Sequence, residues 1–95
     1  MTESEKSGGR LPVSQIVQQA ASELAMLLDR QAQSVSSVRR TDDGWTAQVE
    51  VLELERVPPT TSVMASYRVD LDHQGLLLEY EMVRRYSRGE VERRR

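Results

Sequence analysis

The stretch TDDGWTAQVEV, residues 41–51, decides the fold of this chain. Its first four residues form a predicted hairpin turn, in which Gly44 can supply the positive φ angle. The seven residues that follow alternate apolar and polar side chains, and the apolar ones are Trp45, Ala47, Val49 and Val51. This alternation is typical of a strand with one buried face. The stretch therefore predicts a β-hairpin whose first strand is short and spans residues 35–40.

Two further strands are predicted downstream of this hairpin. Pro58-Pro59 ends the second strand, because two consecutive residues without an N–H group cannot continue a central ladder. Residues 63–72 alternate again and form the third strand, and residues 72–75 form the next turn. In the fourth strand, one face is predicted to carry Leu76, Leu78, Tyr80 and Met82, and the opposite face Leu77, Glu79, Glu81 and Val83.

The alternation slips by one residue at Val51-Leu52, where the next apolar residues are Leu52 and Leu54. A β-bulge produces such a change of parity. The alternative is that a partner covers the second face of this strand. Both interpretations stay open at the level of the sequence.

Upstream of the hairpin, apolar residues recur at the spacing of one helix face, and a helix is predicted over residues 12–31. Pro12 fits its first turn, where a missing N–H costs little. Residues 1–11 are predicted to be a disordered leader, residues 12–88 a single α+β domain, and residues 89–95 a basic C-terminal tail that frays. The apolar helix positions are Val13, Ile16, Val17, Ala20, Leu24, Leu27 and Leu28.

The order of these elements predicts an α+β fold, with one N-terminal helix packed on a four-stranded antiparallel β-meander. One helix covers one face of a sheet. The other face is therefore solvated or used by a partner, and four apolar side chains are expected there: Leu52, Leu54, Leu77 and Val83.

Composition excludes several classes of protein. The chain has 95 residues and no cysteine, so disulfide scaffolds, thiolate zinc sites and cysteine nucleophiles are excluded. No apolar run approaches the roughly 20 residues that span a bilayer, and the first ten residues lack the apolar core of a signal peptide. We expect a cytoplasmic protein that does not bind membranes.

The net charge of −2 hides a strong segregation. Residues 1–41 carry a net charge of +1, residues 42–81 carry −7, and residues 82–95 carry +4. An acidic middle followed by a basic end is suited to electrostatic association with a partner or with copies of the same chain.

The residues that could perform catalysis do not form a recognisable site. His73 lies in a predicted turn, and no second histidine or cysteine exists to complete a metal site with it. The glutamates of the strands occupy the alternate positions that an ordinary solvated face requires. We therefore predict no enzyme activity, no metal and no cofactor.

The basic end is a better candidate for a functional site, because six arginines and Tyr86 lie between residues 84 and 95. Arginine with aromatic neighbours can bind nucleic acid. Against this, Glu90 and Glu92 interrupt the run, and no helix-turn-helix or RNP signature is visible. The pattern favours protein docking, with nucleic-acid binding as the alternative.

Four stretches stand out together: VRRTDDGW (38–45), VLELERVP (51–58), YRVDLD (67–72) followed by Gly75, and VRRYSRG (83–89). They occur in the order found in the gas vesicle protein O family, and the chain resembles that family over about residues 12–90. The ELERVP and RRY segments are the most specific parts of the resemblance. Pro59, which follows the motif's closing proline, has no assigned consequence.

The resemblance implies a non-enzymatic accessory protein of gas vesicle formation in bacteria or archaea. It implies contacts with other gas vesicle shell or accessory proteins, association with the vesicle, and for some members a regulatory role in expression. It carries over no catalytic or cofactor-binding residue. A PepSY or cystatin-like binding module is a further alternative, because Asp70-Leu71-Asp72 before Gly75 and a helix-plus-meander layout recur in such modules.

The sequence thus yields one hypothesis for a partner-binding surface. Apolar anchors on the sheet face away from the helix would be surrounded by a charged rim. The alternative is that the apolar members cap the core around the bulge. The proposed residues are Leu52, Leu54, Val83, Arg84, Arg85, Tyr86 and Arg88.

Overall fold

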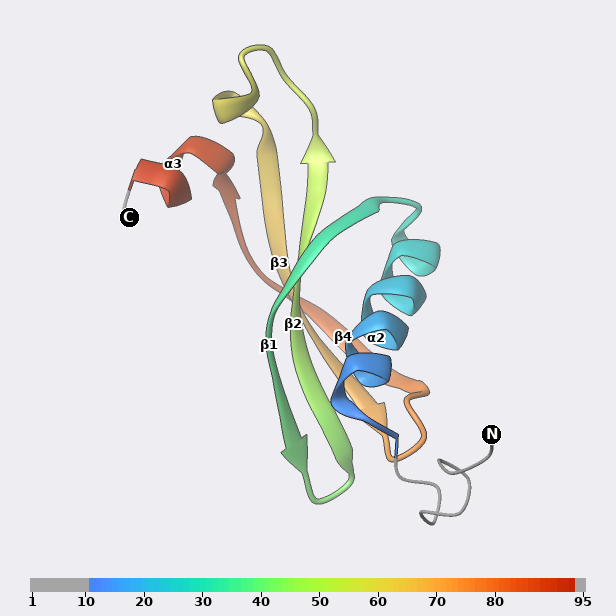
Figure 1. The fold of residues 1–95 in the computed structure, drawn as a ribbon. Helices are drawn as coiled ribbons and strands as arrows, with labels where there is room; N and C mark the ends of the chain where they lie inside the picture. Colours follow the sequence, from blue (N-terminus) through green and yellow to red (C-terminus); the bar gives the residue numbers. More distant parts are fainter. Residues whose placement is uncertain (1–10, 94–95) are drawn as a thin grey trace.

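The computed structural model describes residues 11–93 and consists of one long helix, a four-stranded sheet and two short helical segments (Figure 1). The sheet is antiparallel, and its strands lie in the order β1-β2-β3-β4. This confirms the predicted α+β meander. In chain order the elements are α2 (Val13–Leu28), β1 (Gln31–Thr41), β2 (Gly44–Leu54), the 3-10 helix η1 (Pro59–Thr61), β3 (Val63–Asp72), β4 (Leu77–Ser87) and α3 (Arg88–Arg93).

The predicted hairpin between β1 and β2 is confirmed. The N–H of Gly44 donates a hydrogen bond to the Thr41 hydroxyl, 3.1 Å away. Gly44 has a φ of 153°, and a Cβ atom there would lie 2.1 Å from the carbonyl oxygen of Leu71. Glycine is therefore required at position 44, which pairs with Asp72 at the end of β3. The four alternating apolar positions of β2 before the bulge are buried, as the alternation predicts: Trp45, Ala47, Val49 and Val51.

The helix and the first strand have different bounds from those predicted. Helix α2 ends at Leu28, because Asp29 adopts the left-handed conformation and its N–H bonds the carbonyl of Ala25. The chain then enters β1 at Gln31, so the prediction of helix through residue 31 and a strand over 35–40 was wrong. The predicted helix face is nevertheless the one that packs on the sheet, through Ile16, Ala20 and Leu24, which are fully buried.

The predicted β-bulge is present close to its expected place. The register between β2 and β3 shifts between Leu52 and Leu54, so the extra residue is Glu53. Strand β2 then ends at Leu54, four residues before Pro58. The prolines begin η1 instead of ending the strand.

The prediction for β4 was wrong in part, because β4 carries two register shifts relative to β3 that leave Leu78 and Val83 outside the ladder. Leu77, expected on the face away from the helix, pairs with Leu71 and packs against the core. Tyr80 and Met82 lie on the helix side, as predicted. However, α2 lies mainly over β1 and β2, so both remain partly exposed. Leu76 and Leu78 are also more than half exposed.

The chain forms an elongated body, about 48 Å long and 23 Å across. Helix α2 covers one part of the sheet, whereas α3 packs on η1 at the opposite end (Figure 1). The structure continues β4 to Ser87 and then forms α3, which includes residues 89–93 of the tail that was predicted to fray. Most of the predicted leader lies outside the described residues, but Leu11 packs on the core. Between residues 11 and 93, no helix is both long and apolar enough to cross a membrane.

Candidate partner-binding site

The sheet face away from α2 carries a hydrogen-bonded cluster to which each strand contributes one residue. We call this the Glu50 cluster: Ser36 of β1, Glu50 of β2, Ser66 of β3 and Tyr86 of β4. The Tyr86 hydroxyl donates to Glu50 Oε1 at 2.7 Å, and the Ser36 hydroxyl donates to Oε2 at 2.6 Å. Ser66, which is buried, also donates to Oε1. The strand register places these groups side by side, since Glu50 lies opposite Ser66.

The cluster shifts the titration of both of its ionisable members. Partial burial raises the pKa of the Glu50 carboxyl, but the hydrogen bonds from Ser36, Ser66 and Tyr86 together outweigh it, so the pKa lies below its ordinary value. Burial and the hydrogen bond to the Glu50 carboxylate raise the pKa of Tyr86 to about 12. At neutral pH, Glu50 is therefore an ionised acceptor and Tyr86 a neutral donor.

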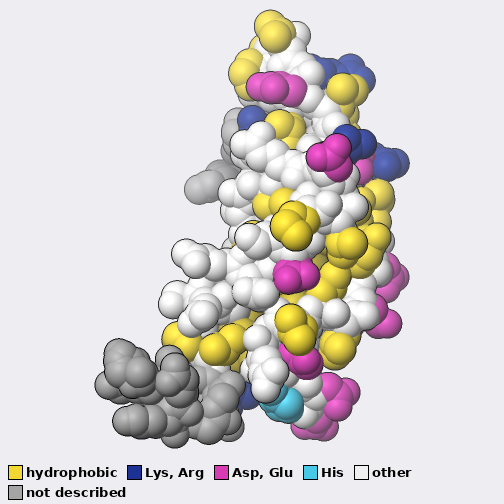
Figure 2. Space-filling view, turned by 90° about the vertical axis from the view of Figure 1, so that its right-hand side faces the viewer, with side chains coloured by type: hydrophobic (Ala, Val, Ile, Leu, Met, Phe, Trp, Pro, Cys, Tyr) yellow, Lys and Arg dark blue, Asp and Glu magenta, His cyan; other side chains and the backbone are white. Residues whose placement is uncertain are grey.

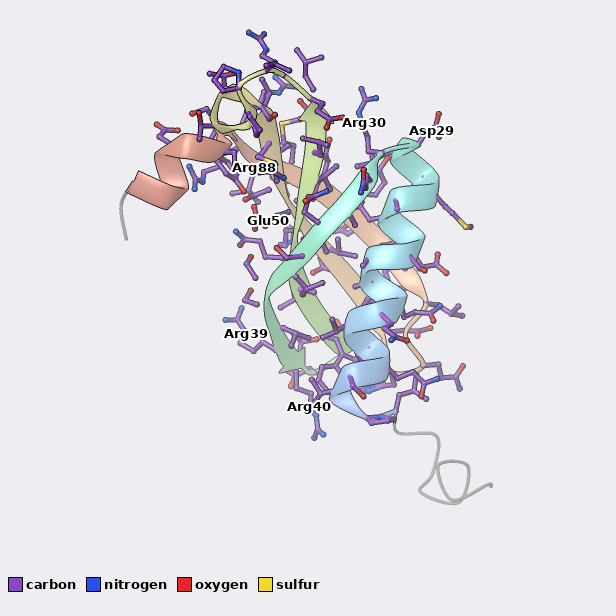
Figure 3. The ribbon with its side chains drawn as sticks, turned by 45° about the horizontal axis from the view of Figure 1, so that its top comes forward. Asp29, Arg30, Arg39, Arg40, Glu50 and Arg88 are labelled. Carbon is purple, nitrogen blue, oxygen red and sulfur yellow. The ribbon has the colours of Figure 1, made fainter. Side chains whose placement is uncertain are left out.

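The Glu50 cluster forms part of the lining of an open groove of about 540 Å³. Two arginines stand over the groove. The Arg84 guanidinium stacks 4.4 Å from the centre of the Tyr86 ring, and Arg88 donates a hydrogen bond to Gln33 of β1 at 3.0 Å. Figure 3 shows Glu50 and Arg88 toward the α3 end of the sheet, whereas Arg39 and Arg40 lie at the other end of β1. The groove thus combines an ionised floor with a basic rim.

A second charged group lies on the same face, nearer the β3–β4 turn. Arg68 contacts three carboxylates: Asp70 and Glu79 at 3.1 Å each, and Glu81 at 2.5 Å. The Thr46 hydroxyl donates to Asp70 at 2.8 Å. Partial burial alone would raise the pKa of the Asp70 carboxyl, but the Thr46 and Arg68 hydrogen bonds lower it below its ordinary value. This part of the face is therefore acidic, and the part around the groove is basic at its rim.

The structure brings some of the predicted site residues together. Arg84, Tyr86 and Arg88 line the groove. Leu52 pairs with Met64, a groove residue, and is half-buried. Val83 is 53% exposed and lines a neighbouring hollow with Arg68.

Two predicted site residues lie elsewhere. Arg85 pairs with Ala65, a core residue on the helix side, and its Nε bonds Glu53 at 2.6 Å. Leu54 ends β2 outside the groove and is half exposed. Arg84 and Arg85 are adjacent in β4 and therefore point to opposite faces, and the bulge at Val83 decides which one faces the groove: it places Arg84 on the groove side and Arg85 on the helix side.

Glu50, Ser36 and Ser66 were not predicted as site residues from the sequence. Glu50 was interpreted as part of an ordinary solvated face, because strand alternation gives the face but not the cross-strand neighbours. Serine at position 66 was the available signal, since a serine at the centre of a long strand calls for a hydrogen-bond partner.

One protein family is found both by comparison with family models and by comparison with individual proteins. The model of the family "Gas vesicle synthesis protein GvpO" matches residues 1–92. Gas vesicle protein O of Streptomyces sp. (strain CB03234) is 54% identical over 78 residues, which are 82% of this chain and 61% of the relative. Gas vesicle protein O1 of Halobacterium salinarum is 36% identical over 65 residues, 68% of this chain and 55% of the relative.

A third relative, gas vesicle protein O of Haloferax mediterranei, is 39% identical over 49 residues, 52% of this chain and 35% of the relative. The chain therefore spans about three fifths or less of the length of these relatives. No solved protein structure gives a significant match. With a family model that covers nearly the whole chain and a relative at 54% identity, this chain belongs to the gas vesicle protein O family.

Proposed function

We propose that this chain is a non-enzymatic accessory protein of gas vesicle formation, which acts by binding other gas vesicle shell or accessory proteins. The family match supports the process. The groove supports the mode of action, because it gathers Arg84, Tyr86 and Arg88 around an ionised carboxylate on a face that α2 leaves uncovered. This groove is the single structural observation that carries the proposal.

The groove is suited to a polar segment of a partner chain. Tyr86 offers apolar surface at its floor, and Arg84 and Arg88 offer donors to carboxylates at its rim. Glu50 Oε2 accepts one hydrogen bond within the cluster and retains capacity for a second from a partner's N–H group. The proposed contact therefore offers donors to carboxylates of the partner and one acceptor to an N–H group of the partner.

The titration of the cluster supports binding and not proton transfer. A general acid or base at neutral pH needs a pKa near 7. The Glu50 and Tyr86 pKa values are shifted away from 7 in opposite directions. The cluster is therefore suited to hold a fixed charge in a fixed place.

The test is co-purification from a cell that forms gas vesicles, with the tagged chain as bait. The double variant Arg84→Glu/Arg88→Glu should lose most of the captured gas vesicle protein. The matched control Arg39→Glu/Arg40→Glu changes charge equally at the other end of β1 and should capture as the unaltered chain does. Equal capture by both double variants would refute the groove as the binding surface.

Nucleic-acid binding is the competing function, and the same arginines would carry it. The Glu50 carboxylate in the groove opposes it, because a phosphate brought to Arg84 would also approach this negative charge. A gel-shift assay at low salt separates the two functions. A salt-sensitive shift that Arg84→Glu/Arg88→Glu abolishes would support the nucleic-acid alternative over protein docking.

A further inference from the structure

Strand β4 is an edge of the sheet, and the middle of this strand carries exposed apolar residues. Strand order leaves β4 paired with β3 on one side only. Tyr80, Met82 and Val83 are 41%, 37% and 53% exposed. Figure 2 shows hydrophobic side chains gathered in a band beside the helix, with acidic side chains along its outer margin. An open edge with apolar surface is a template for pairing with another strand.

The charges along β4 indicate what would pair with it. Glu79 and Glu81 precede the middle of the strand, and Arg84 and Arg85 follow it. A strand of this order is complementary to itself when reversed, because an antiparallel copy brings its basic half against the acidic half of the first. A parallel copy would set like charges side by side. We propose that β4 pairs antiparallel with β4 of a second copy, which joins two four-stranded sheets into one.

The bulge at Val83 and the charges of β4 together select one register for this pairing. On the groove side of the sheet lie Glu79, Glu81, Arg84 and Tyr86, and on the helix side lie Tyr80, Met82 and Arg85, as their partners in β3 show. Directly opposed residues must share a face. That condition holds when Glu81 faces Arg84 of the other copy, because Tyr80 then faces Arg85 and Glu79 faces Tyr86.

This register also places the exposed apolar residues at the symmetry axis. Met82 of one copy and Val83 of the other would lie next to each other at the centre, Met82 on the helix side and Val83 on the groove side, with an acid–base pair on either side. Tyr80 opposite Arg85 allows a cation–π contact on the helix side. The centre is thus apolar and its flanks are charged, as in a small specific interface.

The same bulges restrict what else can pair with β4. An irregular edge disfavours the continuous ladder that open-ended strand addition needs. In the proposed dimer both β4 edges are used, and the outer edges become the two β1 strands. The arrangement is therefore closed, with two copies and one twofold axis.

The first experiment measures the mass of the purified chain by analytical ultracentrifugation across a concentration series. A concentration-dependent dimer is expected. Glu81→Arg and Arg84→Glu should each weaken it at least about tenfold, since each sets like charges opposite at two symmetric places. The double variant Glu81→Arg/Arg84→Glu should restore the dimer, and Arg39→Glu should leave it unchanged. A chain that stays monomeric throughout, or a double variant that does not recover, overturns the proposal.

The second experiment tests the register directly. The chain has no cysteine, so introduced cysteines report without background. A mixture of Glu81→Cys and Arg84→Cys chains should form a mixed disulfide under mild oxidation, whereas Glu81→Cys mixed with Arg39→Cys should not. Crosslinking through β1 instead of β4 would refute the proposed edge. Dimer formation and partner capture can be told apart, because Glu81→Arg/Arg84→Glu should restore the dimer while the groove still lacks Arg84 at its rim.

Discussion

Glu50 is one carboxylate that ties four strands together. It accepts hydrogen bonds from Ser36, Ser66 and Tyr86, so its charge is held by groups from β1, β3 and β4. Hydrogen bonds to a charged acceptor are worth more than neutral ones. The charge is therefore a structural feature of the uncovered face as well as the floor of the groove.

Glu50→Gln should lower the free energy of unfolding by about 1 kcal/mol at pH 7, a value reduced for partial exposure. The pKa of Glu50 is lowered on folding, so its contribution is present above the unfolded value of 4.5 and is lost as pH falls through the folded value. The deficit of the variant should shrink by pH 3. Urea unfolding at both pH values measures it, with exposed Glu55→Gln as the control. A deficit that does not change with pH would contradict the role of the charge.

Tyr86→Phe tests the other end of the same hydrogen bond. The pKa of Tyr86 is raised from 10.0 to about 12 on folding, so the unfolded chain loses this proton first as pH rises. Its contribution to stability is complete below pH 10 and is lost between about 10 and 12.

Without the hydroxyl group, the fall in thermal stability over that range should be shallower in Tyr86→Phe than in the unaltered chain. Tyr80→Phe, which removes a partly exposed hydroxyl from the same strand, is the control. If both variants lose stability over this range as steeply as the unaltered chain, the hydrogen bond from Tyr86 to Glu50 makes no such contribution.

At the scale of the elements, local patterns predicted what depends on neighbours in sequence. The hairpin at Gly44, strand β3 and the buried face of β2 follow from turn residues and alternation, and each is confirmed. The faces of β4 were partly mispredicted, because the bulges at Leu78 and Val83 are set by pairing with β3 and not by β4 itself. The Glu50 cluster was missed for the same reason, since it exists only once the register of four strands is known.

The hairpin turn gives a prediction at this scale. Gly44→Ala puts a Cβ atom 2.1 Å from the Leu71 carbonyl oxygen, which the β3 backbone cannot avoid without moving. We expect a loss of about 2–4 kcal/mol in stability and a fall in melting temperature of roughly 10 °C or more. Asp43→Ala, next to it and exposed, should change stability by less than about 0.5 kcal/mol. Similar melting temperatures for the two variants would show that the turn relaxes freely.

At the scale of the whole molecule, the two ends of the body are held by different means. The end near α2 rests on fully buried apolar side chains, Ile16, Ala20 and Leu24 among them. The opposite end projects beyond this core and is held by hydrogen bonds of Ser62. The N–H of Arg88 bonds the carbonyl of Ser62 at 2.9 Å, and the N–H of Arg56 bonds the Ser62 hydroxyl at 3.0 Å.

Local opening is easiest where little apolar surface is buried. Amide hydrogen exchange should therefore be slowest at Val49 and Val69, which are fully buried at the centre of the sheet, and faster by orders of magnitude across residues 55–62 and α3. The groove lies between these two regions, so a partner bound in it should slow exchange in α3 and leave Val49 unchanged. Uniform protection along the body would contradict the predicted gradient of stability. Protection gained at the β1–β2 turn on partner binding would contradict the placement of the site.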